Sequence, residues 1–290
     1  MTDDISSTGR LQARPSSGEK ILVIGDGAVA RAFGQALERA AFPVERWWRA
    51  QRRPLPAGDV VLLAVRDEAL AEVAALVMRS LAPSGDAQSL PILLHCAGAV
   101  PAEEPFAKLQ PRPLGVGLIH PLRSLAGAAD DADLVGTVFG VQGDELGRDA
   151  ALRLVKRLGG TPLELDRDAL ARYHAAAALV SNHAVGLVDA AVELLESTGL
   201  PRAQAVHALA NLLASTAANL RKVGLPQALT GPIARGDVEV IARHLLALRP
   251  TREIAALYRV TGRRVVQVAA EKGRATAEAL DRIRALLTGE

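Results

Sequence analysis

The residues best suited to chemistry in this sequence are a glycine-rich segment and histidines at 95, 120 and 174. The segment Gly25–Ala30 reads GDGAVA, a G-x-G-x-x-A pattern between a short apolar run and residues 31–41, which have helical period. In a strand–turn–helix of this kind the glycines let a pyrophosphate approach the backbone, and the helix N-terminus offers it free N–H groups. The pattern predicts a dinucleotide-binding loop. The alternative is an ordinary turn between a strand and a helix.

A dinucleotide bound there would contact the ends of three predicted strands, at 20–25, 59–65 and 90–95. In an open parallel sheet, ligands bind beyond the carboxyl ends of the strands. From these strand ends we expect the following residues to bind the cofactor: Gly25, Asp26, Gly27, Ala28, Val29, Val65, Arg66, Cys96 and Ala97.

The residues at the end of the predicted strand 42–48 indicate whether NAD or NADP is bound. An Asp or Glu usually binds the ribose hydroxyls of NAD at this point, but the sequence has Arg49, Arg52 and Arg53. Guanidinium groups suit a 2′-phosphate, so we expect NADP, bound in part by Arg49 and Arg52. The alternative is a solvated basic loop. The link to the next strand is too short for a crossover helix and contains two prolines, which makes this side of the site unusual.

A long apolar segment, residues 168–198, predicts a helix of about 45 Å. Ala and Leu cover nearly all of its circumference, so we expect it to be buried on most sides. Its polar residues, among them His174, Ser181 and Asn182, then need partners from other segments or from a ligand. Because free imidazole titrates near neutral pH, a histidine suits proton transfer, and His174 is the best candidate for a proton donor. The alternative is a core histidine bonded to a backbone carbonyl.

Other polar residues are expected to surround the substrate. His120 ends the predicted strand 115–120, although a histidine in such a position can also be structural. Arg235 lies in the loop 225–236 and suits a substrate carboxylate, or else forms an ion pair within the protein. We assign catalysis to His174, Asn182 and His120, and substrate binding to His120, Ser124, Ser181, Thr230 and Arg235.

Composition narrows the class of protein. The chain has 290 residues with 34 basic and 32 acidic side chains, so we expect no nucleic-acid or membrane partner. A single cysteine excludes an internal disulfide and fits a reducing cytosol. The six histidines form no ligand-spaced cluster, which argues against a metal, and no apolar run approaches the roughly 18 residues of a membrane span. We therefore expect a cytoplasmic protein with a small-molecule substrate.

The order of predicted elements is strand–helix alternation followed by helices alone. This order predicts an α/β domain and then an all-α domain. We expect a flexible tail at 1–18, a dinucleotide-binding domain at 19–166, and a helical substrate and dimerisation domain at 167–290. The apolar helices of the last domain exceed what about 125 residues can cover, which predicts a homodimer.

Several motifs occur together in this chain: Gly25-x-Gly27, His95-Cys-Ala-Gly98, His120-Pro121-Leu122, Tyr173–Ala176 with Ser181-Asn182, and the run 228–237. Together they resemble one bacterial family that has a Rossmann-like domain followed by a domain of unknown function. That family is similar to the superfamily of 6-phosphogluconate dehydrogenase, ketopantoate reductase and pyrroline-5-carboxylate reductase. The resemblance implies an NADP-binding Rossmann-like domain, a helical C-terminal domain like that of 6-phosphogluconate dehydrogenase, and hydride transfer in the cleft between them.

The resemblance also implies roles for single residues. Several relatives carry a catalytic Lys at the start of the long helix and an Asn about two turns later. His174 and Asn182 stand at the comparable positions, and the helix has no Lys. The function implied is an NADP(H)-dependent oxidoreductase acting on a small carbonyl or imine compound with a carboxylic acid group, for which ketopantoate-like reduction is one candidate. The alternative is a non-catalytic NADP-binding sensor or scaffold.

Overall fold

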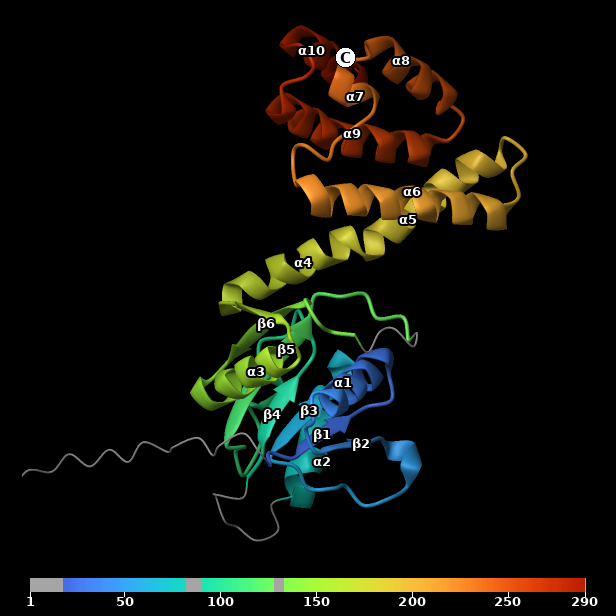
Figure 1. Ribbon diagram of the computed structural model, residues 1–290. Helices are drawn as coiled ribbons and strands as arrows, with labels where there is room; N and C mark the ends of the chain where they lie inside the picture. Colours follow the sequence, from blue (N-terminus) through green and yellow to red (C-terminus); the bar gives the residue numbers. More distant parts are fainter. Residues whose placement is uncertain (1–17, 82–89, 128–132, 290) are drawn as a thin grey trace, which may run out of the picture. The chain divides into compact units, whose positions relative to one another are not determined.

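The computed structural model describes residues 18–81, 90–127 and 133–289 (Figure 1). The part before Ser181 is built around one seven-stranded sheet in the order β2-β1-β3-β4-β5-β6-β7. Neighbouring strands pair in parallel, except for the antiparallel pair β5 and β6. The strands are β1 (Ile21–Ile24), β2 (Val44–Trp47), β3 (Val60–Leu63), β4 (Ile92–His95), β5 (Gly115–Pro121), β6 (Val138–Gly143) and β7 (Thr161–Glu164). Every strand expected from the sequence is present.

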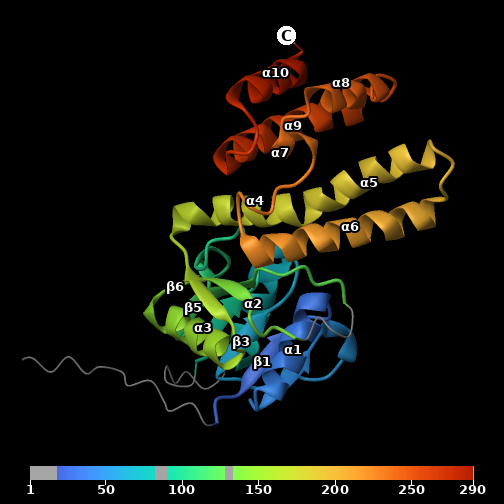
Figure 2. The same ribbon diagram turned by 45° about the horizontal axis from the view of Figure 1, so that its top comes forward.

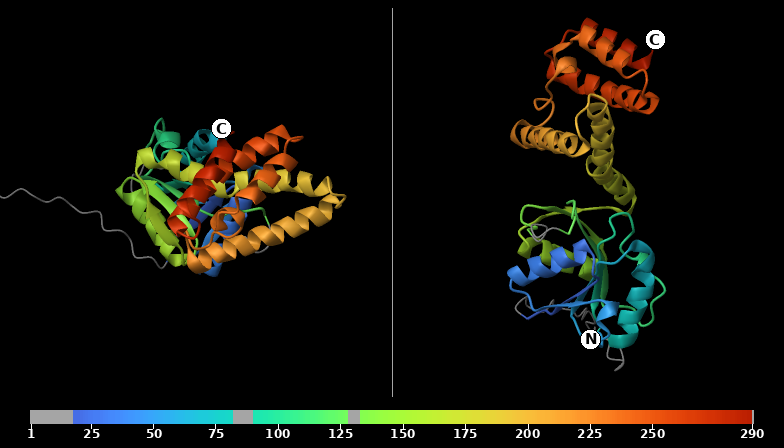
Figure 3. Two further views of the ribbon diagram at one scale, coloured as in Figure 1. Left: turned by 90° about the horizontal axis from the view of Figure 1, so that it is seen from above. Right: turned by 90° about the vertical axis from the view of Figure 1, so that its right-hand side faces the viewer.

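Helices cover both faces of the sheet. The helices α1 (Ala28–Arg39) and α3 (Glu145–Arg157) lie on one face, and α2 (Leu70–Leu81) lies on the other (Figure 3, right). Side chains of β1 alternate between the two layers, because successive strand residues point to opposite faces. The short 3-10 helices are η1 (Arg49–Gln51), η2 (Asp67–Ala69), η4 (Glu104–Phe106) and η6 (Arg167–Ala169).

The link between β2 and β3 contains η1 in place of a crossover helix, as its length predicts. Leu55 packs into the apolar layer on the α2 face. The indole Nε1 of Trp47 donates a hydrogen bond to the carbonyl of Arg53 at 3.0 Å. The link therefore covers its part of the sheet with its own side chains.

The helix expected at 168–198 is interrupted. It forms α4 (Leu170–Val180) and α5 (Asn182–Glu196), with φ −108° and ψ −75° at Ser181 between them. The Ser181 hydroxyl donates a hydrogen bond to the carbonyl of Ala177 at 2.9 Å, a contact that often bends helices. The expectation of one unbroken helix is therefore wrong. The chain divides into two compact units at this point, Met1–Ser181 and Asn182–Glu290, so α4 is grouped with the sheet.

The second unit contains only helices among its described residues. Its elements after α5 are α6 (Arg202–Val223), α7 (Pro232–Arg235), α8 (Val238–Ala247), α9 (Arg252–Lys272) and α10 (Ala277–Thr288). The helices α5 and α6 lie side by side as a hairpin (Figure 2). The helices α7 to α10 enclose a separate core that includes Ile241, Val266 and Ile283. The helix α9 ends at Lys272, and the next residue, Gly273, has φ +70°.

Apolar side chains on α4, α5 and α6 are widely exposed. Val180 is 78% exposed, Val185 70% and Leu212 63%, so the expected burial of the long helical segment is wrong for the single chain. The segment Arg167–Glu196 is long and apolar enough to cross a membrane, by length and composition alone. The expectation that no apolar run approaches a membrane span is therefore wrong for this segment, although one such helix is weak evidence for a span.

The packing of α3 on the sheet depends on Gly147. A Cβ added there would lie 2.0 Å from the carbonyl oxygen of Val116. The substitution Gly147→Ala should lower the free energy of unfolding by about 1–3 kcal/mol, because α3 or β5 must move. At Gly186 on α5 an added Cβ meets no atom within 4 Å. The control Gly186→Ala should leave the free energy of unfolding unchanged or raise it by about 0.5–1 kcal/mol.

Urea unfolding followed by circular dichroism measures both effects. Equal midpoints for the two variants would contradict this account of how α3 packs.

Candidate functional site

A pocket of about 540 Å³ opens where β1, β3 and β4 end. The glycine-rich loop and the residues after β3 and β4 form its lining: Gly25, Asp26, Gly27, Ala28, Val29, Ala64, Val65, Arg66, Asp67, Ala69, Cys96 and Ala97. All nine residues predicted from the three strand ends line this pocket. Three lining residues were not predicted from the sequence: Ala64, because the end of β3 was placed two residues too late, and Asp67 and Ala69, which belong to the 3-10 helix η2. A shorter strand would have added Ala64 to the prediction.

The two glycines of the loop have different surroundings. Gly25 has φ +139°, and a Cβ added there would lie 2.2 Å from the carbonyl oxygen of Ala64, so this turn requires glycine. At Gly27 an added Cβ meets no atom within 4 Å. The helix α1 starts directly after Gly27, and no side chain caps its first turn. An anion beside Gly27 can therefore accept hydrogen bonds from the free N–H groups of that turn.

A cation lies beside the same loop. The Arg31 side chain donates a hydrogen bond to the carbonyl of Asp26 at 2.5 Å, and it lies 3.9 Å from the carboxylate of that residue. An added Cβ at Gly127, on the segment after β5, would lie 3.1 Å from the Arg31 guanidinium. The segment that follows His120 therefore reaches the start of α1.

Arg49 and Arg52, which were expected at the cofactor, do not line the pocket. Arg49 lies 2.6 Å from the carboxylate of Glu72, and both side chains are largely exposed. Arg53 lies 3.3 Å from Glu45 and donates to a backbone carbonyl of β2. The Arg52 side chain is exposed and makes no hydrogen bond or ion pair with another described residue. In the absence of a ligand, Arg49 and Arg53 of the basic loop therefore form surface ion pairs.

His120, Tyr173 and His174 meet beside the loop that contains Cys96, Ala97 and Gly98. The His120 Nδ1 lies 2.9 Å from the Tyr173 hydroxyl, and the two rings meet edge to face at 5.5 Å. The His174 ring lies 5.9 Å from the His120 ring on another side. A Cβ added at Gly98 would lie 2.8 Å from the His120 Nε2, so the imidazole packs directly against Gly98. Three motifs that are distant in the sequence are thus brought together.

His95 shapes the loop that carries Gly98. Its side chain is fully buried, and its Nδ1 accepts a hydrogen bond from the backbone N–H of Ala97 at 3.2 Å. Nδ1 is therefore unprotonated and the proton of the neutral ring is on Nε2, for which the described residues provide no well-aligned acceptor. The ring also contacts Phe106, with the centroids 5.8 Å apart.

Burial keeps the side chains of His95 and His120 neutral. It lowers the pKa of His95 to about 4, with a small further contribution from His120, while the carbonyls of Pro101 and Ala102 act in the opposite sense. Burial, and then the charge of His174, lowers the pKa of His120 to about 4. Burial also raises the pKa of the Tyr173 hydroxyl. At neutral pH these three groups are therefore uncharged.

The other expected site residues can be described by their own surroundings. Ser124 is exposed on the segment after β5, and Asn182 begins α5 in the second unit. Thr230 is exposed in the loop before α7. Arg235 lies 2.7 Å from the carboxylate of Asp237, so the ion pair considered as its alternative role is the one that forms. Among the described residues, no group of three or more His, Cys, Asp or Glu could hold a metal ion.

Part of the sequence matches a known protein family, and the fold is similar to that of several solved structures. Residues 137–265 match the family model of a domain of unknown function, DUF2520, and no curated protein matches the chain. Protein TM1727 from Thermotoga maritima is similar, with a TM-score of 0.67, 23% identity, and coverage of 88% of this chain and 100% of that one. The 1-pyrroline-5-carboxylate reductase from Streptococcus pyogenes gives a TM-score of 0.56 at 16% identity and covers 93% of this chain and 100% of that one.

Pyrroline carboxylate reductase from Plasmodium falciparum, solved with NADP bound, gives a TM-score of 0.57 at 11% identity and covers 90% of this chain and 98% of that one. At these identities the likeness shows the fold. The chain is an α/β Rossmann-like domain followed by a helical domain, and its resemblance to a Rossmann-like family with a C-terminal domain of unknown function is confirmed.

His95 links stability to pH. Its pKa is 6.5 in the unfolded chain and about 4 in the fold, so between these values the unfolded chain binds more protons. The stability contributed by neutral His95 is full above about pH 6.5, falls as the pH drops below that value, and is lost near pH 4. The loss is on the order of 2–3 kcal/mol, and His120 adds to it with the same sign.

Urea unfolding at pH 7, 6 and 5 should show a falling midpoint. His95→Gln should be less stable at pH 7 but lose less stability over this interval. A wild-type midpoint that does not change with pH would show that His95 is not held neutral by the fold.

Proposed function

We propose that this protein is an NADP(H)-dependent oxidoreductase that transfers a hydride to or from a small carbonyl or imine substrate. The observation that carries the proposal is the pocket at the ends of β1, β3 and β4, together with His120, which packs against Gly98 of the loop whose Cys96 and Ala97 line that pocket. The fold shared with two pyrroline carboxylate reductases, one of them solved with NADP bound, supports it.

The residues of the pocket fit a dinucleotide. Gly25 permits the turn, Gly27 leaves room for the pyrophosphate, and the first turn of α1 supplies N–H donors. Arg31 places a positive charge beside the same loop. Val65, Arg66, Cys96 and Ala97 would bind the remainder of the cofactor along the strand ends. The bound cofactor supplies or accepts the hydride, so the protein has to orient it, hold the substrate and move one proton.

The preference for NADP over NAD rests on the basic loop after β2. Arg52 is exposed without a described partner, and the Arg49–Glu72 pair is exposed on both sides. An exposed ion pair contributes little to stability, so a 2′-phosphate can displace it and form a charge-assisted hydrogen bond.

The substrate we propose is a small carboxylic acid, with ketopantoate-like reduction as one candidate. His120 and His174 would serve the proton transfer, and Ser124, Ser181, Asn182 and Thr230 would contact polar parts of the substrate. For Arg235 to bind the carboxylate, its ion pair with Asp237 has to open.

Fluorescence titration with NADPH and NADH tests the cofactor site. The wild-type protein should bind NADPH more tightly than NADH. Gly27→Val should abolish binding of both without lowering the melting temperature, because the new side chain would occupy open space where the pyrophosphate lies. Arg52→Ser should weaken NADPH binding by about 1–3 kcal/mol and spare NADH.

A screen of keto acids and cyclic imines, following NADPH absorbance, then tests turnover. Failure of the wild-type protein to bind either cofactor would overturn the proposal. Binding without turnover of any compound would favour a sensor or scaffold.

We also propose that the protein is a homodimer assembled through its helical unit. On α6, Leu212 and Leu213 are 63% and 45% exposed, and Leu187 on α5 is 42% exposed. An apolar surface of this extent on one hairpin is typical of an interface. Light scattering should give a dimer at micromolar concentration, and Leu212→Glu should shift it toward the monomer. A wild-type monomer in light scattering would contradict the proposed dimer. Sedimentation of the protein with lipid vesicles through Arg167–Glu196 would also contradict it.

A further inference from the structure

The Tyr173 hydroxyl makes two contacts with the same residue of β5. It lies 2.9 Å from the ring Nδ1 of His120 and 3.2 Å from the backbone carbonyl oxygen of His120. The tyrosine is held in place from the other side. A Cβ added at Gly140 on β6 would lie 2.9 Å from the Tyr173 ring and 3.0 Å from its hydroxyl.

Both contacts can be hydrogen bonds at the same time in only one arrangement of the phenol and imidazole protons. The phenol has a single proton, and a carbonyl oxygen can only accept. The hydroxyl must therefore donate to the carbonyl of His120, while the Nδ1–H of His120 donates to the phenolic oxygen. Because the ring is neutral at neutral pH, its second nitrogen, Nε2, is then unprotonated and can accept a proton.

The His120 Nε2 is the ring nitrogen that faces the pocket loop. It lies 2.8 Å from the position of a Cβ at Gly98, and Cys96 and Ala97 of the same loop line the pocket. The neighbouring histidines are less suited to this role. The Nε2 of buried His95 carries the ring proton, and exposed His174 packs against the side of His120.

We propose that His120 is the general base of the proposed oxidoreductase and that Tyr173 is a positioning residue that keeps its Nε2 unprotonated. In the oxidative direction the substrate O–H or N–H bond breaks and the proton moves to His120 Nε2. The hydride leaves the adjacent carbon for NADP⁺, and the C=O or C=N bond forms. In reduction the Nε2 of His120 first takes a proton from water and passes it to the oxygen or nitrogen of the substrate as the hydride from NADPH reaches the adjacent carbon and the C=O or C=N bond becomes single. This inference rests on the proposed function, but the protonation of His120 can be measured without a substrate.

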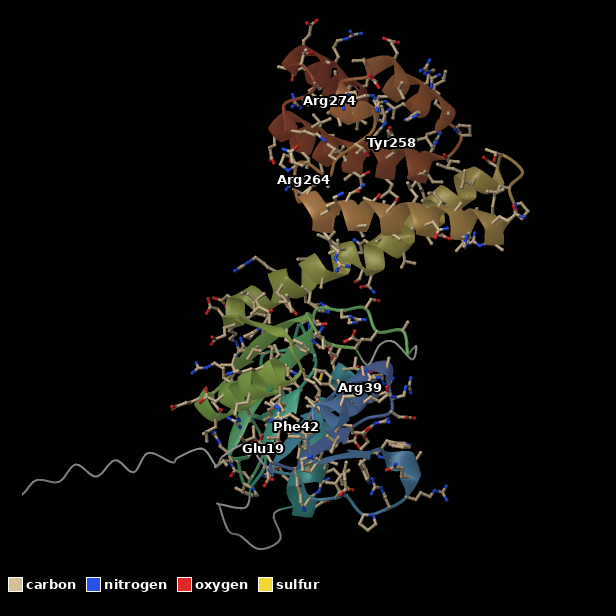
Figure 4. The ribbon with its side chains drawn as sticks, viewed as in Figure 1. Glu19, Arg39, Phe42, Tyr258, Arg264 and Arg274 are labelled. Carbon is tan, nitrogen blue, oxygen red and sulfur yellow. The ribbon has the colours of Figure 1, made fainter. Side chains whose placement is uncertain are left out.

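The chain contains a matched control for this pair. In the second unit, Tyr258 lies on α9 (Figure 4). Its hydroxyl lies 2.9 Å from Nδ1 of His244, and the rings meet edge to face at 5.9 Å. No contact between the Tyr258 hydroxyl and the His244 carbonyl accompanies this one in the described structure. The two pairs share their local geometry, and the first lies against the loop that contains Gly98.

The experiment uses full-length protein labelled with ¹⁵N-histidine, in the wild type, Tyr173→Phe and Tyr258→Phe. Comparison with His120→Gln identifies the His120 signals. In the wild type at pH 7, Nδ1 of His120 should carry the proton and Nε2 should not. In Tyr173→Phe the proton should move to Nε2 in part or fully, whereas Tyr258→Phe should leave His120 unchanged. Circular dichroism and melting temperature confirm that each variant is folded.

The same variants are then assayed with NADPH and a keto acid or cyclic imine that turns over in the screen. Tyr173→Phe should lower kcat at least about tenfold, and His120→Gln by about 10²–10⁴, with KM and NADPH affinity changed less than kcat. Tyr258→Phe should keep the wild-type kcat.

A wild-type His120 protonated on Nε2, or a Tyr173→Phe variant with wild-type kcat, would overturn the inference. If the protein binds no dinucleotide but His120 is protonated on Nδ1, the proposed function is overturned. The role of Tyr173 in setting the His120 tautomer is then still supported.

Discussion

The contact between the His120 ring and the backbone of Gly98 is the constraint on which the rest of the site depends. With a Cβ at residue 98 only 2.8 Å from the imidazole, no larger residue fits there without displacing the ring or the loop. The loop is itself shaped by the hydrogen bond from Ala97 to the buried ring of His95. The chain thus holds a histidine from β5 against the wall of a pocket formed by β1, β3 and β4.

Glycine performs the same task at the other close approaches of this unit. Gly25 lets the loop after β1 pass the carbonyl of Ala64, and Gly140 lets Tyr173 lie across β6. Because glycine has no side chain, the neighbouring segment can approach the backbone closely at each of these positions. The parallel sheet sets which segments meet, because the carboxyl ends of β1, β3 and β4 lie at one edge. The glycines then set how closely they meet.

The sequence allowed most of the fold and the pocket to be predicted, because both follow from where apolar strands end. It did not identify Tyr173 as a site residue, since an aromatic residue on an Ala-rich helix is most often a core residue, and its contact with His120 spans 53 positions. The ion pair of Arg49 with Glu72 on α2 could not be predicted, because an exposed charge pairs with whichever opposite charge the fold brings near. The break at Ser181 depends on a local hydroxyl contact that apolar periodicity does not show. The exposure of α5 and α6 could not be deduced from apolar content alone, which predicts burial without saying what provides it.

A crystal structure of the full-length protein with NADP⁺ bound tests the central claim most directly. The account predicts a pyrophosphate that accepts hydrogen bonds from the backbone at Gly27 and the first turn of α1. It also predicts a nicotinamide ring beside Cys96 and Ala97, on the side of the loop that His120 can reach. A dinucleotide bound outside this pocket, or a nicotinamide separated from His120 by protein atoms, would contradict it.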